Sequence, residues 1–154
     1  MKRSLFFLTI LVATILFSAA AFGQTFTGRF DRNAVTRGDA ARGRVTMVIP
    51  AGLHVNSNRP SSQYAIATEL RISGNGIKNP SIKYPRGKDR KFQFSEDAIN
   101  VYEGSVSFGF SVKVPQNFRG PFLRLRASVR YQACTEEVCY PPKTKEITLT
   151  VPVK

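Results

Sequence analysis

The sequence predicts an all-β fold, a single immunoglobulin-like antiparallel β-sandwich, from three observations. Several short segments alternate between apolar and polar residues, the two-residue period of a strand with one buried face. Clusters of Gly, Pro and Asn separate these segments, as expected for turns. No window of a dozen residues has the period of an amphipathic helix. Seven to nine short strands in about 130 residues are typical of such a sandwich.

Seven segments carry the strand pattern. It is strongest where Val106, Phe108 and Phe110 alternate with Ser and Gly. Later segments repeat it with Leu and Val against Arg, and then against Thr. In chain order, the expected strands are 26–30, 45–49, 70–72, 82–84, 105–114, 123–131 and 147–153. The turn residues between them lie at 37–39, 50–52, 58–60, 74–76 and 115–117.

The first 23 residues are expected to be a signal peptide. A basic start precedes an apolar run at 5–17 and then small residues, which is the order of regions in a secretory signal. Ala21 and Gly23 fit the −3 and −1 positions of a cleavage site. An uncleaved membrane anchor is the alternative, because the apolar stretch approaches spanning length. We expect a signal peptide at 1–23, a domain at 24–154 without a membrane span, and a periplasmic or secreted protein.

The chain is strongly basic, with 23 Lys and Arg against 10 Asp and Glu and a formal net charge of +13. A basic surface is one sign of nucleic-acid binding. The basic residues are scattered, however, and no motif interleaves them with aromatic residues. Because export also argues against such a partner, we expect no nucleic acid. A solvated face is the simplest interpretation, and weak attraction to anionic envelope surfaces is another.

Metal and hydrolase sites are disfavoured by composition. One His and two Cys are too few for a closed Cys/His zinc site. A triad that uses histidine as its base could use only His54. We therefore expect His54 to be a structural or surface residue, and we expect neither a metal nor a cofactor.

The two cysteines, Cys134 and Cys139, follow one expected strand and precede Pro141 and Pro142. They are expected to face each other across a tight turn, where antiparallel neighbours are close enough for a disulfide. An exported protein should form that bond readily. A loop this short stabilises by only about 2 kcal/mol, and exposed disulfides are the more easily reduced ones. A structural clip and an exchange site therefore remain equally open from the residues alone.

The cysteine segment resembles a known family. Residues 131–145 read Tyr-Gln-Ala-Cys-Thr-Glu-Glu-Val-Cys-Tyr-Pro-Pro-Lys-Thr-Lys, which is similar to the cysteine hairpin in the N-terminal periplasmic domain of the thiol:disulfide interchange protein DsbD. Residues 52–70 and 84–104 resemble earlier segments of that domain more loosely. The resemblance covers about 26–153.

The resemblance implies an immunoglobulin-like thiol:disulfide exchange domain whose cycling pair is Cys134 and Cys139. Cys139 would form the mixed disulfide with a thioredoxin-like or disulfide isomerase partner of the cell envelope, and Cys134 would resolve it. It also implies an aromatic cap loop over the disulfide, which should lie at 91–97. Phe94 is the preferred cap residue and Phe92 the alternate, although both could equally be ordinary core residues.

Two departures from the family bear on function. Four residues separate the cysteines, one fewer than in the best-known members. The chain as given also contains no membrane electron channel, so a separate membrane carrier would have to supply electrons. We favour an exported thiol:disulfide oxidoreductase component that passes electrons to or from its partners through Cys134 and Cys139. The alternatives are a non-catalytic β-sandwich that binds a protein partner, with a structural hairpin disulfide, and a basic envelope-surface binder.

Overall fold

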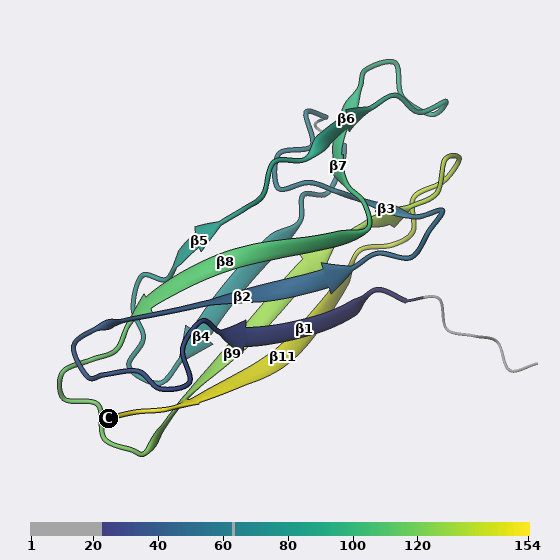
Figure 1. Cartoon of the computed structure of the whole chain (residues 1–154). Coiled ribbons are helices and arrows are strands. Elements are labelled where there is room, and N and C mark those ends of the chain that lie inside the picture. Colours follow the sequence, from purple (N-terminus) through teal and green to yellow (C-terminus); the bar gives the residue numbers. More distant parts are fainter. Residues whose placement is uncertain (1–22, 63) are drawn as a thin grey trace, which may run out of the picture.

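The structure is a computed structural model that describes residues 23–62 and 64–154. These residues form eleven strands and no helix (Figure 1). The strands are β1 (Thr25–Phe30), β2 (Ala40–Val48), β3 (His54–Asn56), β4 (Glu69–Gly74), β5 (Ser81–Lys83), β6 (Lys88–Arg90), β7 (Ile99–Tyr102), β8 (Ser105–Lys113), β9 (Phe122–Tyr131), β10 (Ala133–Cys134) and β11 (Lys143–Pro152).

Three antiparallel sheets make up the fold. Two of them, ordered β1-β2-β8-β5 and β11-β9-β4, are the layers of the sandwich, and β1 also contacts β11 along one side. The third sheet, ordered β10-β3-β7-β6, lies at one end of the sandwich. In Figure 1 the β9–β11 hairpin runs the length of the molecule, and its tip reaches this end. The predicted immunoglobulin-like antiparallel sandwich is confirmed.

Alternation along the strands builds the main core. In β2, β8 and β9 every second residue is buried. Burial of such aliphatic and aromatic side chains is the main stabilising contribution in folding. The largest fully buried side chains include Met47, Phe108, Leu123, Leu125 and Tyr131. The main core therefore lies chiefly between the two long sheets, and neither cysteine belongs to it.

The third sheet carries a different packing arrangement on each face. Val55, Tyr102 and Ala133 belong to the main core. Phe92 and Ile99 belong to a second, smaller cluster, which also contains Val101 and against which Ala65 packs. Because strand residues alternate between faces, this sheet closes the sandwich with one face and builds a separate small core with the other.

The seven predicted strands are all present, but the expected total of seven to nine is too low. The four strands without a prediction are β3, β6, β7 and β10, and together they are the third sheet. All three residues of β3 are buried, and all three of β6 are exposed. Segments of two to four residues without alternation carry no period-two signal, which is why this sheet was missed.

The predicted signal peptide lies outside the described residues apart from Gly23. Across the described ranges, no helix has the length and apolar character needed to cross a membrane.

Candidate functional site

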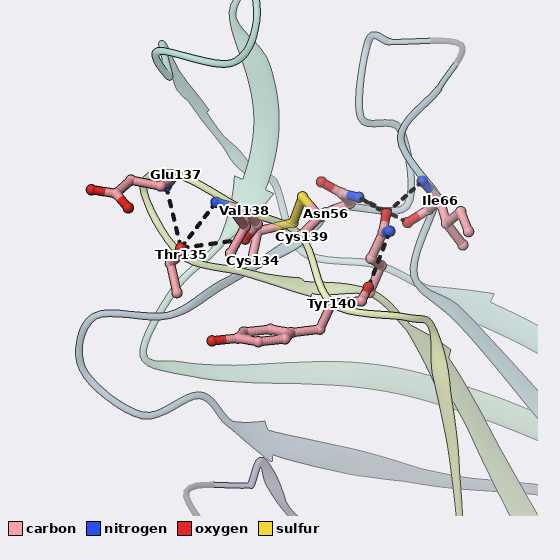
Figure 2. The surroundings of a disulfide bond; sticks show 9 residues. Asn56, Ile66, Cys134, Thr135, Glu137, Val138, Cys139 and Tyr140 are labelled. Carbon is pink, nitrogen blue, oxygen red and sulfur yellow. Dashed lines mark hydrogen bonds between the residues drawn. A yellow bond between two sulfur atoms is a disulfide. The ribbon is translucent and has the colours of Figure 1, made fainter.

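The two cysteines close the tip of the β9–β11 hairpin (Figure 2). The Cys134 and Cys139 sulfurs are bonded at 2.01 Å, and the two residues form an antiparallel bridge with a Cα–Cα distance of 4.0 Å. The Tyr140 N–H donates to the Ala133 carbonyl at 2.8 Å, which continues the pairing beyond the bridge. The expectation that the cysteines face each other across a tight turn is confirmed.

Thr135 shapes the turn between the cysteines. Its hydroxyl oxygen accepts hydrogen bonds from the backbone N–H groups of Glu137 at 3.2 Å and Val138 at 3.1 Å, a local side-chain bond that favours turns over regular strand. Beyond the turn, Pro141 and Pro142 have no N–H to donate. The regular ladder with β9 accordingly resumes only at β11, which leaves the cysteine segment as a separate lobe.

The two cysteines differ in exposure. Cys134 is fully buried, whereas Cys139 is exposed. Cys139 lines a cavity of about 210 Å³ together with Phe94, Asn56 and Gln132. Only the Cys139 side of the disulfide is therefore accessible from solvent.

The predicted cap residues lie beside this cavity. Phe94 is 41% exposed, and its ring stacks on Phe92 with a centroid distance of 5.2 Å. Phe92 is buried in the small core and stacks in turn on His54 at 4.1 Å. The structure thus brings Phe94 to the Cys139 cavity and places Phe92 beneath it. The capping role itself stays a prediction.

His54 lies closer to the cysteines than its sequence context indicated. It is buried, and it pairs with Cys134 in the β3–β10 ladder, so both side chains are on the same face of the sheet. Burial lowers the pKa of His54 below its usual 6.5, and Arg90 adds to this, while Glu136 and Glu103 act against it. The prediction of a structural residue fits this position, and the alternative of a surface residue is wrong.

A polar frame fixes the hairpin to its neighbours. The Gln132 side-chain oxygen accepts from the Asn56 amide at 3.0 Å and from the Ile66 N–H at 3.2 Å, and its nitrogen donates to the Tyr140 carbonyl at 3.2 Å (Figure 2). The Asn56 carbonyl accepts from the Thr68 hydroxyl at 2.6 Å. One glutamine therefore links the cysteine segment to both β3 and the 57–68 loop.

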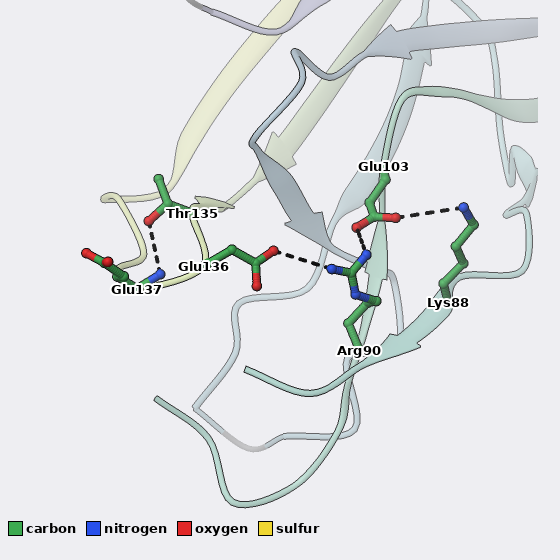
Figure 3. A network of polar contacts seen from close by, with 6 residues as sticks. All are labelled: Lys88, Arg90, Glu103, Thr135, Glu136 and Glu137. Atoms are coloured by element: carbon green, nitrogen blue, oxygen red, sulfur yellow. Dashed lines mark hydrogen bonds and ion pairs between the residues drawn. The ribbon is translucent and has the colours of Figure 1, made fainter. Parts of the chain in front are cut away.

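Ion pairs connect the cysteine turn to the third sheet (Figure 3). Arg90 contacts Glu103 at 2.7 Å and Glu136 at 3.4 Å, and Lys88 contacts Glu103 at 3.7 Å. Glu137 points away from this group in Figure 3, and no ion pair of Glu137 is found in the described part of the chain. Sequence reasoning missed Arg90 and Glu103, because nothing local in the sequence links them to the turn.

Exposed apolar side chains gather at this end of the molecule. Of the large apolar residues exposed in the described ranges, Val138 and Tyr140 flank Cys139 in sequence, while Phe94 and Tyr64 line its cavity. A cluster of exposed apolar residues is a feature of protein interaction sites. The same ranges contain no group of three or more His, Cys, Asp or Glu that could hold a metal ion.

Comparison with known proteins agrees with this geometry. The family model described as "Thiol:disulfide interchange protein DsbD, N-terminal" matches residues 26–151. The fold is similar to the N-terminal periplasmic domain of ScsB from Proteus mirabilis, with a TM-score of 0.59 and 11% identity. That match covers 83% of this chain and 45% of the ScsB chain, so this chain corresponds to less than half of it.

A second solved structure is the N-terminal domain of DsbD from Neisseria meningitidis in its reduced form. The match has 19% identity and a TM-score of 0.45, and it covers 71% of this chain and 80% of that one. A comparison with curated proteins gives no match.

Proposed function

Because the chain belongs to the DsbD N-terminal family, we propose that it exchanges electrons with thioredoxin-like or disulfide isomerase partners of the cell envelope through the Cys134–Cys139 pair. The observation that carries this is the unequal exposure of the two sulfur-bearing residues, with Cys139 exposed and Cys134 buried. In thiol–disulfide exchange, access decides which sulfur is attacked.

The exchange follows directly from this asymmetry. A partner thiolate attacks the sulfur of Cys139, a mixed disulfide forms, and Cys134 leaves as a thiolate. A second partner thiolate then attacks the partner's sulfur in the mixed disulfide and releases Cys139. The partner is thereby oxidised and the domain is reduced by two electrons. In the opposite direction, the Cys139 thiolate attacks a partner disulfide, and Cys134 then attacks Cys139 to release the reduced partner.

The exposed apolar residues around Cys139 supply a surface for such a partner. Phe94, Tyr64, Val138 and Tyr140 surround the attacked residue without covering it completely. Aromatic side chains are enriched in protein interfaces. We expect the partner to displace Phe94 when its own cysteine approaches Cys139.

We also propose that the chain is exported to the periplasm. The family is one of periplasmic domains, and residues 1–23 have the features of a signal peptide. Cleavage after Gly23 would leave 24–154 as the working domain in an oxidising compartment. A separate membrane carrier is the proposed source of electrons.

Trapping of the mixed disulfide tests the assignment of roles. Cys134→Ala should accumulate partner adducts on Cys139 that disappear on reduction, because the domain has lost the thiol that resolves them from its own side. Cys139→Ala is the matched control and should trap few adducts, because Cys134 is buried. The measurement is non-reducing electrophoresis of envelope extracts followed by identification of the adducts.

Two results would contradict exchange. One is the absence of adducts with Cys134→Ala, together with a reduction potential far below about −300 mV, the range of structural disulfides. The other is a double Cys→Ala variant that still performs every partner-dependent activity, which would indicate a binding module with a hairpin clip.

A further inference from the structure

Arg90 lies between two carboxylates that come from different parts of the site. It contacts Glu103, just after β7, at 2.7 Å and Glu136, in the cysteine turn, at 3.4 Å (Figure 3). Arg90 is also the last residue of β6, immediately before the cap segment 91–97. One guanidinium group therefore connects the base of the cap segment to the turn that carries Cys139.

We propose that Arg90 is a positioning residue that holds the cap segment closed beside Cys139 through its ion pair with Glu136. This proposal rests on the exchange function of Cys139 given above. Opening of the pair would let Phe94 move away from the cavity that it shares with Cys139. Arg90 would then control how often the disulfide is open to attack.

The two contacts of Arg90 differ in strength. The Glu103 side chain is 25% exposed and close to Arg90, whereas the Glu136 side chain is 65% exposed and farther away. Exposed ion pairs are weak and are screened by salt. Arg90 should therefore stay anchored on Glu103 while the pair with Glu136 opens and closes, and added salt should favour the open form.

The variant Arg90→Gln distinguishes release of the cap segment from a simple effect of charge on the reduction rate. Removal of Arg90 leaves Glu136 without its cation, and a nearby carboxylate raises the pKa of a thiol. Because a higher pKa makes a thiol a poorer leaving group, charge alone predicts slower reduction of the disulfide in Arg90→Gln. Release of the cap segment predicts faster reduction.

The experiment measures the rate at which dithiothreitol reduces the disulfide of the full domain, at low and high salt. We expect Arg90→Gln and Glu136→Gln to be reduced about two- to five-fold faster at low salt, the range of an exposed pair. Salt should accelerate the wild type more than Arg90→Gln. The double variant should be no faster than either single variant, because both remove one interaction.

Glu137→Gln is the matched control, since it removes the same charge one position along the turn from a side chain that points away from Arg90. It should behave like the wild type. The proposal is overturned if Arg90→Gln is reduced at or below the wild-type rate, if Glu137→Gln is accelerated as much as Glu136→Gln, or if the wild type and Arg90→Gln respond equally to salt.

Thermal unfolding of each variant identifies any that has lost its fold. If Arg90→Gln fails to fold, Glu136→Gln against Glu137→Gln decides the proposal. If the positioning role of Arg90 is wrong, the adducts of Cys134→Ala are unaffected. That outcome is therefore distinguishable from failure of the exchange function.

Discussion

At the scale of a single residue, Phe94 is the side chain that we predict limits access to Cys139. Its ring is supported from below by Phe92 and lines the same cavity as Cys139. In the reduced domain, Phe94→Ala should therefore let iodoacetamide alkylate Cys139 several-fold faster, because the ring no longer limits approach. The control is Phe122→Ala, because Phe122 is also an exposed phenylalanine but lies at the start of β9. Equal alkylation rates in all three proteins would show that Phe94 does not cap the site.

His54 should make the stability of the domain depend on pH. Burial lowers its pKa below 6.5 in the folded protein, so the unfolded chain binds a proton more readily between that lowered value and 6.5. The free energy of unfolding should be highest above pH 6.5 and should decrease as the pH falls through this window. His54→Phe keeps a ring that can stack on Phe92 but does not titrate. Urea unfolding at pH 7.5 and 5.0 should therefore show a smaller loss in His54→Phe, and an equal loss would exclude His54 as the source.

At the scale of strands and turns, the long elements follow from local pattern and the short ones do not. The alternation of Val106, Phe108 and Phe110 predicts β8 because each side chain meets the core or solvent according to its own position. The strand β3 pairs with both β10 and β7, which are distant in sequence, and all its residues are buried. A strand whose partners determine it carries little signal of its own.

In the candidate site, too, the contact within one hairpin is predictable from the sequence, whereas the contacts between distant segments are not. Both cysteines belong to one hairpin, so their spacing predicts their contact. The ion pair between Arg90 and Glu136 joins residues 46 positions apart, and the stack of His54 on Phe92 depends on the path of the cap segment. These contacts depend on the tertiary fold and leave no signal in the local sequence pattern.

Gln132 is one of the residues that hold the cysteine segment in position. It bridges Asn56, Ile66 and the Tyr140 carbonyl. Gln132→Ala should lower the free energy of unfolding by about 1–2 kcal/mol, because it removes three hydrogen bonds, two of them partly buried. Gln93→Ala, at an exposed position of the cap segment, should change it by less than about 0.5 kcal/mol. Denaturant titration of both variants measures these changes. Equal stabilities would show that the Gln132 hydrogen bonds do not stabilise the domain.

At the scale of the whole molecule, the stabilising core and the cysteine lobe are separate. The fully buried side chains of the two long sheets, among them Phe108, Leu123 and Leu125, form one cluster that does not include either cysteine. The disulfide lies at the end of the molecule, on the hairpin tip beyond the regular ladder. If the pair cycles between redox states as proposed, the change takes place outside the main core, which contains neither cysteine.

Reduction should therefore weaken the domain without unfolding it. Opening a loop this short removes about 2 kcal/mol in the chain-entropy description, against a total of about 5–15 kcal/mol for typical domains. Unfolding of oxidised and reduced protein in urea should give a midpoint shift of that size and a single transition in both states. The far-ultraviolet circular dichroism of the reduced form should stay that of a β-protein. Loss of the β-spectrum on reduction would mean that the disulfide holds the sandwich together, and it would favour a structural clip over an exchange site.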